Sequence, residues 1–169
     1  MFGSGANVRS RVDPDIEVIN ESRESLFRAF NATDLDAFMR SMANDIVVMG
    51  QGGPPALVGE SSVRSNYKEF FDNGPFIPNL THSSDEVIVC GDWAFDRGTW
   101  RIMRTFKRVV RQELLNSCYI MIWHRQTTGT WKLARIIWNG TPVPVKADKT
   151  AGAAASQRLH HPKRTRSTS

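Results

Sequence analysis

The pattern of hydrophobic and polar residues divides this chain into two parts that meet near Pro75. Before that point, apolar residues recur at intervals of three and four, which is typical of helices with one buried face. The first stripe follows Asp13 and Pro14, which suit a helix cap and first turn, and it predicts a helix ending near Asn31. The stripe consists of Ile16, Ile19, Arg23, Leu26, Phe27 and Phe30.

Two shorter helices and one strand are predicted in the rest of this first part. Thr33 or Asp34 can cap a second helix, and Ser61 or Ser62 can cap a third. The β-branched run at 46–49 predicts a short strand between these helices. The apolar faces of the two helices are formed by Leu35, Phe38, Met39 and Met42, and by Val63, Tyr67, Phe70 and Phe71.

The second part of the chain shows the alternation of strands, with turn residues between them. Three helices followed by a meander of long strands predict an α+β fold. We expect a curved antiparallel sheet that forms a cone closed by the three N-terminal helices. The predicted strands of the meander are 86–91, 93–106, 113–125 and 130–139.

Strand parity predicts which side chains line the cone, because alternate residues face opposite sides of a sheet. In the last two strands both sides are apolar, so both must be covered. The helices can cover one side, and a second subunit is expected on the other, which predicts a homodimer through the outer sheet face. The predicted cavity wall consists of Tyr119, Met121, Trp123, Ala134, Ile136 and Trp138. Plain core packing is the alternative for Met121 and Ile136.

The net charge of +5 does not indicate a nucleic-acid-binding fold. Residues 148–169 carry five basic side chains and one acidic one, so this segment holds +4 of the total. We therefore expect a domain at 13–146 between disordered segments at 1–12 and 147–169, the latter a basic tail. The chain has no apolar run that could cross a membrane and no secretory signal, which predicts a cytoplasmic protein.

The cysteines and histidines give no metal-binding pattern. Cys90 and Cys118 are far apart and are expected to be buried free thiols in a reducing compartment. His124 is expected on the outer sheet face, because its parity is opposite to that of Trp123. No histidine pair has metal-ligand spacing, so we predict neither a metal nor a cofactor.

Four segments together resemble the SnoaL-like branch of the nuclear-transport-factor-2-like superfamily. They are NATDLDAFMRSMANDIVVM, PALVGESSVRSNYKEFF, VCGDWAFDRGTW and YIMIWHRQTTGTWKLARIIWN. The resemblance covers roughly 15–139 and implies the same helix-closed cone, commonly as a dimer. The group includes ketosteroid isomerases, limonene epoxide hydrolases and polyketide cyclases, so the resemblance implies a small-molecule site inside the cone.

The acids of the two best-defined enzymes in that group are missing here. The positions that match the catalytic tyrosine and the two aspartates of ketosteroid isomerases are Leu26, Gly50 and Met121. Limonene epoxide hydrolases use an arginine between two aspartates, and the matching positions are Arg97, Thr99 and Ile136. Neither mechanism is therefore expected.

Arg97 would need a new partner if it faces the cavity, because an unpaired buried arginine is costly. Our hypothesis is that it binds a carboxylate, enolate or phenolate of an otherwise apolar ligand. The alternative is that Arg97 points outward or pairs with Glu113. Tyr67 could orient a substrate carbonyl or be a core residue, and Tyr119 could act as a weak acid if Arg97 lowered its pKa.

These residues favour a cofactor-independent isomerase, cyclase or dehydratase that acts on a hydrophobic, ring-containing metabolite. The expected catalytic residues are Arg97, Tyr67 and Tyr119, and Thr99 joins the six cavity-wall residues as a substrate contact. The alternatives are a module that binds a small molecule without turnover and a dimerisation domain. A cavity filled by the protein's own side chains would favour dimerisation.

Overall fold

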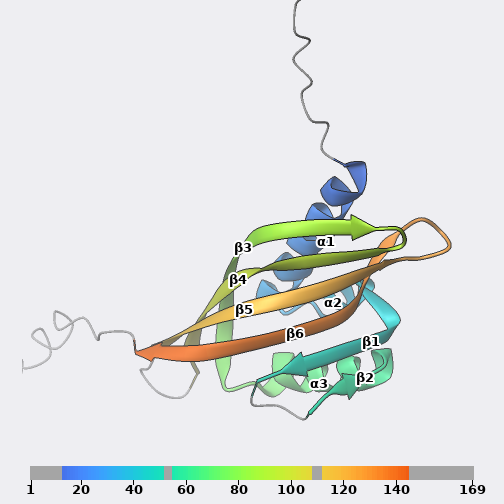
Figure 1. The fold of residues 1–169 in the computed structure, drawn as a ribbon. Coiled ribbons are helices and arrows are strands. Elements are labelled where there is room, and N and C mark those ends of the chain that lie inside the picture. Colours follow the sequence, from blue (N-terminus) through green and yellow to red (C-terminus); the bar gives the residue numbers. More distant parts are fainter. Residues whose placement is uncertain (1–12, 52–54, 108–111, 145–169) are drawn as a thin grey trace, which may run out of the picture.

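A computed structural model describes residues 13–51, 55–107 and 112–144. The segments expected to be disordered, 1–12 and 147–169, lie outside these residues. Three helices lie against one face of a long, twisted sheet, which we call the inner face (Figure 1). The elements are α1 (Pro14–Asn31), α2 (Leu35–Arg40), β1 (Met42–Gly50), β2 (Leu57–Val58), α3 (Glu60–Asn73), β3 (Phe76–Cys90), β4 (Trp93–Phe106), β5 (Gln112–Arg125) and β6 (Trp131–Pro144).

The helix starts follow local capping chemistry. The Asp13 side chain accepts a hydrogen bond from the backbone N–H of Asp15 at 3.0 Å, which confirms the predicted start of α1. Asp34 caps α2 in the same way, through the N–H of Ala37 at 2.9 Å. Helix α3 begins earlier than its serines suggested, because Gly59 adopts a φ of 82° and turns the chain into the helix.

The predicted α+β fold with three N-terminal helices is confirmed, and its sheet is mixed and open rather than wholly antiparallel. Its strand order is β2-β1-β6-β5-β4-β3, and β1 runs parallel to β6. The other neighbouring strands of the sheet pair antiparallel. Strand β3 begins ten residues earlier than predicted, at Phe76. It tolerates Pro78 because it is an edge strand.

A register shift between β5 and β6 changes which residues face inward. Trp123 pairs with Leu133, whereas Ile122 pairs with Arg135, so Ala134 is the extra residue of a bulge. Strict alternation put Trp131 and Leu133 on the outer face, but both are buried in the core.

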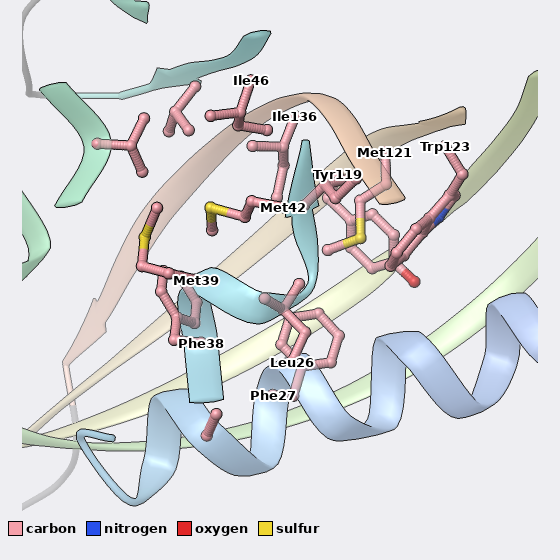
Figure 2. Packing of buried hydrophobic residues seen from close by; sticks show 14 of the residues in the cluster. Leu26, Phe27, Phe38, Met39, Met42, Ile46, Tyr119, Met121, Trp123 and Ile136 are labelled. Atoms are coloured by element: carbon pink, nitrogen blue, oxygen red, sulfur yellow. The ribbon is translucent and has the colours of Figure 1, made fainter. Parts of the chain in front are cut away.

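The hydrophobic core lies between α1 and the inner sheet face (Figure 2). Leu26 and Phe27 of α1 point toward Tyr119 and Met121 of β5 and Ile136 of β6. None of the helices within the described ranges is long and apolar enough to cross a membrane.

Candidate functional site

The structure places Arg97 on the outer face of the sheet, which corrects the expectation that it faces the cavity. Its guanidinium pairs with Asp85 at 3.1 Å and with Glu86 at 3.0 Å, and its side chain is 58% exposed. Thr99, two residues on, is exposed on the same face, as is its register partner Cys118. The reason is strand parity: Ala94, Asp96, Gly98 and Trp100 are the buried residues of this part of β4. Cys118 and Cys90 are both free and exposed, which corrects the expectation that they are buried.

Asp96 therefore occupies the inward position that was expected for Arg97. It is completely buried, and Arg23 of α1 donates to its Oδ2 at 2.7 Å, with an exposed fraction of 4% for Arg23. Trp123 Nε1 donates to the same oxygen at 3.3 Å. Oδ1 accepts from Ser84 Oγ at 3.1 Å and from Tyr119 Oη at 3.3 Å.

The Asp96 carboxylate thus has four donors, two on each oxygen, which is close to its full capacity. A general base needs a free lone pair that can reach a substrate proton. Asp96 has no free lone pair in this arrangement, so it is not placed to act as a general base. The role of the network is structural: it connects α1 to β3, β4 and β5.

Gly98 makes room for the phenol of Tyr119. A Cβ at Gly98 would lie 2.6 Å from Tyr119 Oη and 2.2 Å from the carbonyl oxygen of Ser83. The Tyr119 ring also stacks on Trp100, with ring centroids 5.1 Å apart. Burial and the neighbouring Asp96 charge raise the pKa of Tyr119. The condition under which Tyr119 could act as a weak acid, a pKa lowered by Arg97, is therefore not met.

Beside this network, the core contains a cavity of about 60 Å³. Ligand pockets are commonly roughly 300 Å³ or larger, so most of the cone interior is filled by the protein's own side chains, the arrangement that was expected to favour dimerisation. Of the six predicted wall residues, Ile136 and Trp138 line the cavity. Tyr119, Met121, Trp123 and Ala134 are buried at or near 0% exposure and belong to the surrounding core or network.

Tyr67 contributes the cavity's one phenol and comes from α3. Its ring packs among aromatic side chains, with centroids 4.6 Å from Phe38 and 5.9 Å from Phe71. Burial raises the pKa of Tyr67 to about 12, so the hydroxyl remains protonated at neutral pH. Burial alone causes this shift, with no contribution from a hydrogen bond to a described residue, so the phenolic proton is available to a ligand oxygen.

Sequence reasoning missed the buried pair of Arg23 and Asp96. One signal was present: Arg23 interrupts the apolar stripe of the first helix at a position that must face the core. A buried arginine requires an acid, and Asp96 lies on a strand beneath the helix. Within the described part of the chain, no three metal-binding side chains lie together.

The protein is thus a twisted sheet that helices cover on one face, with a small apolar cavity between the two layers (Figure 1). The model of the SnoaL-like domain family matches residues 24–146. The chain belongs to this family.

Solved structures agree with this assignment. A ketosteroid isomerase-like protein from Erwinia carotovora atroseptica is 25% identical, with a TM-score of 0.69, and the match covers 76% of this chain and 97% of that one. A candidate dehydratase of the nuclear-transport-factor-2-like family from Streptomyces avermitilis is 18% identical, with a TM-score of 0.67 and coverages of 81% and 100%. At these identities the likeness shows the fold. A search of curated proteins finds no significant match.

Proposed function

We propose that this protein binds a compact, ring-containing hydrophobic molecule in its core cavity, with Tyr67 donating a hydrogen bond to an oxygen of the ligand. The observation that carries this proposal is the cavity itself, in which one protonated phenol stands among apolar walls. An apolar pocket with few fixed polar groups is typical of small-molecule sites.

The cavity must enlarge to take such a ligand, and Tyr67 is the side chain that would move. It lines both the cavity and a surface cleft of about 460 Å³ that it shares with Phe70. Rotation of the Tyr67 ring would join the two spaces. The same hydroxyl would then lie at the entrance to the ligand site.

Turnover of the bound molecule is the second candidate function, as a cofactor-independent isomerase, cyclase or dehydratase. Such reactions can proceed by holding one conformer and stabilising oxyanion charge. Tyr67 supplies a suitable donor, whereas Arg97 is removed from this role by its place on the outer face. The saturated Asp96 supports binding more strongly than proton transfer.

A thermal-shift screen with cyclic ketones, terpenoids and polyketides tests the proposal. A ligand well above its dissociation constant should raise the melting temperature by several degrees. Ile136→Phe fills the cavity and should abolish the shift. Val58→Phe is the control, because Val58 is 66% exposed on β2 and does not line the cavity. A shift that survives Ile136→Phe, or a panel without any stabilising compound, would contradict cavity binding.

We also propose that two copies pair through the outer sheet face. Several large apolar side chains on this face are about half exposed, which is unusual for a surface that meets only water. Phe95 pairs with Ile88 across β3–β4, and Ile120 pairs with Ile137 across β5–β6, so they form neighbouring apolar pairs. The exposed group consists of Ile88, Trp93, Phe95, Ile120 and Ile137.

A further inference from the structure

The inner face of the sheet carries a cross-strand row of polar residues beside the core cavity. The row runs from His82 on β3 through Trp100 on β4 to Ser117 on β5, because each residue pairs with the next in register. Each has a buried polar atom without a hydrogen-bond partner among the described residues: Nδ1 of His82, Nε1 of Trp100 and Oγ of Ser117. Buried polar groups are nearly always paired, so three neighbouring exceptions indicate a place where the inner face can receive a polar group.

Trp100 is the member of this row that lines the core cavity. It is 5% exposed, and its ring stacks on Tyr119 and meets the ring of Phe27 edge-on, with centroids 5.8 Å apart. An indole N–H can only donate a hydrogen bond. The cavity therefore has a second donor on its sheet side, in addition to the Tyr67 hydroxyl on its helix side.

His82 supplies a matching acceptor next to Trp100. Its Nε2 lies 3.2 Å from Oε1 of Glu24 on α1, so in the neutral imidazole the proton lies on Nε2 and Nδ1 is left to accept. The His82 side chain is 13% exposed, and its ring packs on Phe27 with centroids 4.4 Å apart. Phe27 lines the cavity and also contacts the Trp100 ring, so the donor and the acceptor lie against the same wall residue.

The Ser117 hydroxyl lies on the other side of the row. A Cβ at Gly140 would lie 2.5 Å from Ser117 Oγ, so this hydroxyl faces β6 rather than Trp100 on β4. Ser117 is also not among the residues that line the cavity. The pair of donor and acceptor beside the cavity is therefore formed by Trp100 and His82, and Ser117 offers a control within the same row.

We propose that the ligand of the core cavity carries a hydroxyl group at its sheet end, bound by Trp100 and His82. This inference rests on the proposed cavity binding and specifies the chemistry of the ligand. The hydroxyl oxygen accepts from Nε1 of Trp100, and the hydroxyl proton is donated to Nδ1 of His82. A carbonyl oxygen in the same place accepts from Trp100 but leaves the histidine nitrogen unpaired, which weakens binding. Because Tyr67 binds an oxygen at the helix side, the ligand class is a cyclic hydroxyketone.

Three six-membered rings of similar size test this assignment: 4-hydroxycyclohexanone, cyclohexanone and cyclohexane-1,4-dione. Titration of the full ¹⁵N-labelled chain at pH 8, followed by its indole N–H signals, gives the dissociation constants. The chain has five tryptophans, and Trp100→Phe and Trp138→Phe assign the two signals of the cavity wall. We expect the hydroxyketone to bind the wild type roughly fivefold more tightly than cyclohexanone and at least roughly threefold more tightly than the dione.

Variants of the row separate the two contacts. Trp100→Phe keeps a ring but removes the donor, and it should reduce the affinity for the hydroxyketone to that for cyclohexanone, as reported by the Trp138 signal. His82→Phe should remove the preference for the hydroxyketone over the dione, whereas Ser117→Ala should leave both preferences within about twofold of the wild type. Ile136→Phe, which fills the cavity, should abolish binding of all three rings.

The possible failures distinguish this inference from the proposed function. Equal binding of the three rings, or tightest binding of the dione, would overturn the hydroxyl assignment while leaving cavity binding intact. A preference that Ser117→Ala removes and His82→Phe does not would overturn it too. If none of the rings shifts the signal of Trp100 or Trp138, cavity binding and the hydroxyl assignment both fail. The comparison of the three rings on the wild type decides the matter even where a variant does not fold.

Discussion

Nη1 of Arg23 lies 2.7 Å from Oδ2 of Asp96, and this buried contact joins the first helix to β4 of the sheet. The carboxylate compensates the charge of the arginine, while Asn20 Oδ1 accepts from Nη2 of Arg23 at 2.6 Å. A buried pair of this kind contributes little over an apolar pair, but removal of one partner leaves the other charge uncompensated.

We predict that Arg23→Met lowers the free energy of unfolding by about 3–5 kcal/mol. The double variant Arg23→Met/Asp96→Leu should recover much of the loss, because no unpaired charge remains. Arg97→Met, which breaks exposed ion pairs, should cost about 1 kcal/mol or less. Urea unfolding measures all three variants. A loss below about 1 kcal/mol for Arg23→Met would show that the pair is not buried in solution.

The two tyrosines of the chain should ionise far above the usual value. Burial raises the pKa of Tyr67 to about 12, and burial with the Asp96 charge raises that of Tyr119 further. Because the chain has no other tyrosine, the absorbance at 295 nm should not rise near pH 10 in the native protein.

The raised pKa values of the two tyrosines also predict how the free energy of unfolding changes at alkaline pH. The unfolded chain loses its phenolic protons near pH 10 while the folded chain keeps them, so the stability from this source is complete below that pH and falls above it. Urea unfolding at pH 8, 10 and 11 measures this loss of stability. The loss should be smaller in Tyr67→Phe and in Tyr119→Phe, because each variant lacks one of the two phenols. A native absorbance step near pH 10 that disappears in Tyr67→Phe would contradict the buried position of that phenol.

The order of helices and strands could be predicted from the sequence, but the inward face of β4 could not. Its outer row begins with Trp93 and Phe95, which are more apolar than Ala94 and Asp96 in the inner row. Hydrophobicity therefore does not identify the buried face of β4, and the hypothesis that Arg97 faces the cavity came from the resemblance to limonene epoxide hydrolases. The inner row is small and polar because the Arg23 guanidinium and the Tyr119 phenol need the space, and only the three-dimensional arrangement shows this.

The register of β6 was also beyond sequence reasoning. A single bulge at Ala134 turns Trp131 and Leu133 inward, and no residue in this run marks a bulge in the way that a glycine would. The C-terminal end of the strand, by contrast, kept its predicted parity: Ile136 and Trp138 line the cavity. The resemblance to the SnoaL-like group predicted the fold correctly, while the arginine that it highlighted lies on the opposite face.

Gly98→Ala should destabilise the protein by about 2–3 kcal/mol, because its Cβ would overlap Ser83 and Tyr119. Gly91→Ala is the control: Gly91 has a φ of 62° but nothing within 4 Å of an added Cβ, so only about 1 kcal/mol of backbone strain is expected. Thermal or urea unfolding compares the two. Equal losses would mean that the sheet relaxes around Gly98 at no additional cost.

Asp15 should stabilise the fold at neutral pH and less so in acid. Hydrogen bonds from Arg125 and Trp131 hold its pKa below the usual value. The stability from Asp15 is therefore present above its unfolded pKa, near 3.9, and is lost as the pH falls through the lower folded pKa. Asp15→Asn should reduce the urea midpoint at pH 7, and the difference should shrink toward pH 3. Glu17→Gln on the exposed side of the same helix should leave the midpoint unchanged at both pH values.

The outer face gives the last prediction, which concerns assembly. Ile120 is 46% exposed and lies between Ile137 of β6 and Arg97 of β4 on the outer face, and Ile120→Lys would add a second positive charge there. If two copies pair through this face, sedimentation of the wild type should give a dimer and that of Ile120→Lys a monomer with unchanged secondary structure. Val58→Lys is the matched control, because Val58 is 66% exposed on β2 at the opposite edge of the sheet from β3. It should leave the dimer intact. A wild type that sediments as a monomer at high concentration would refute the pairing, and a dimer that resists Ile120→Lys would place the interface elsewhere.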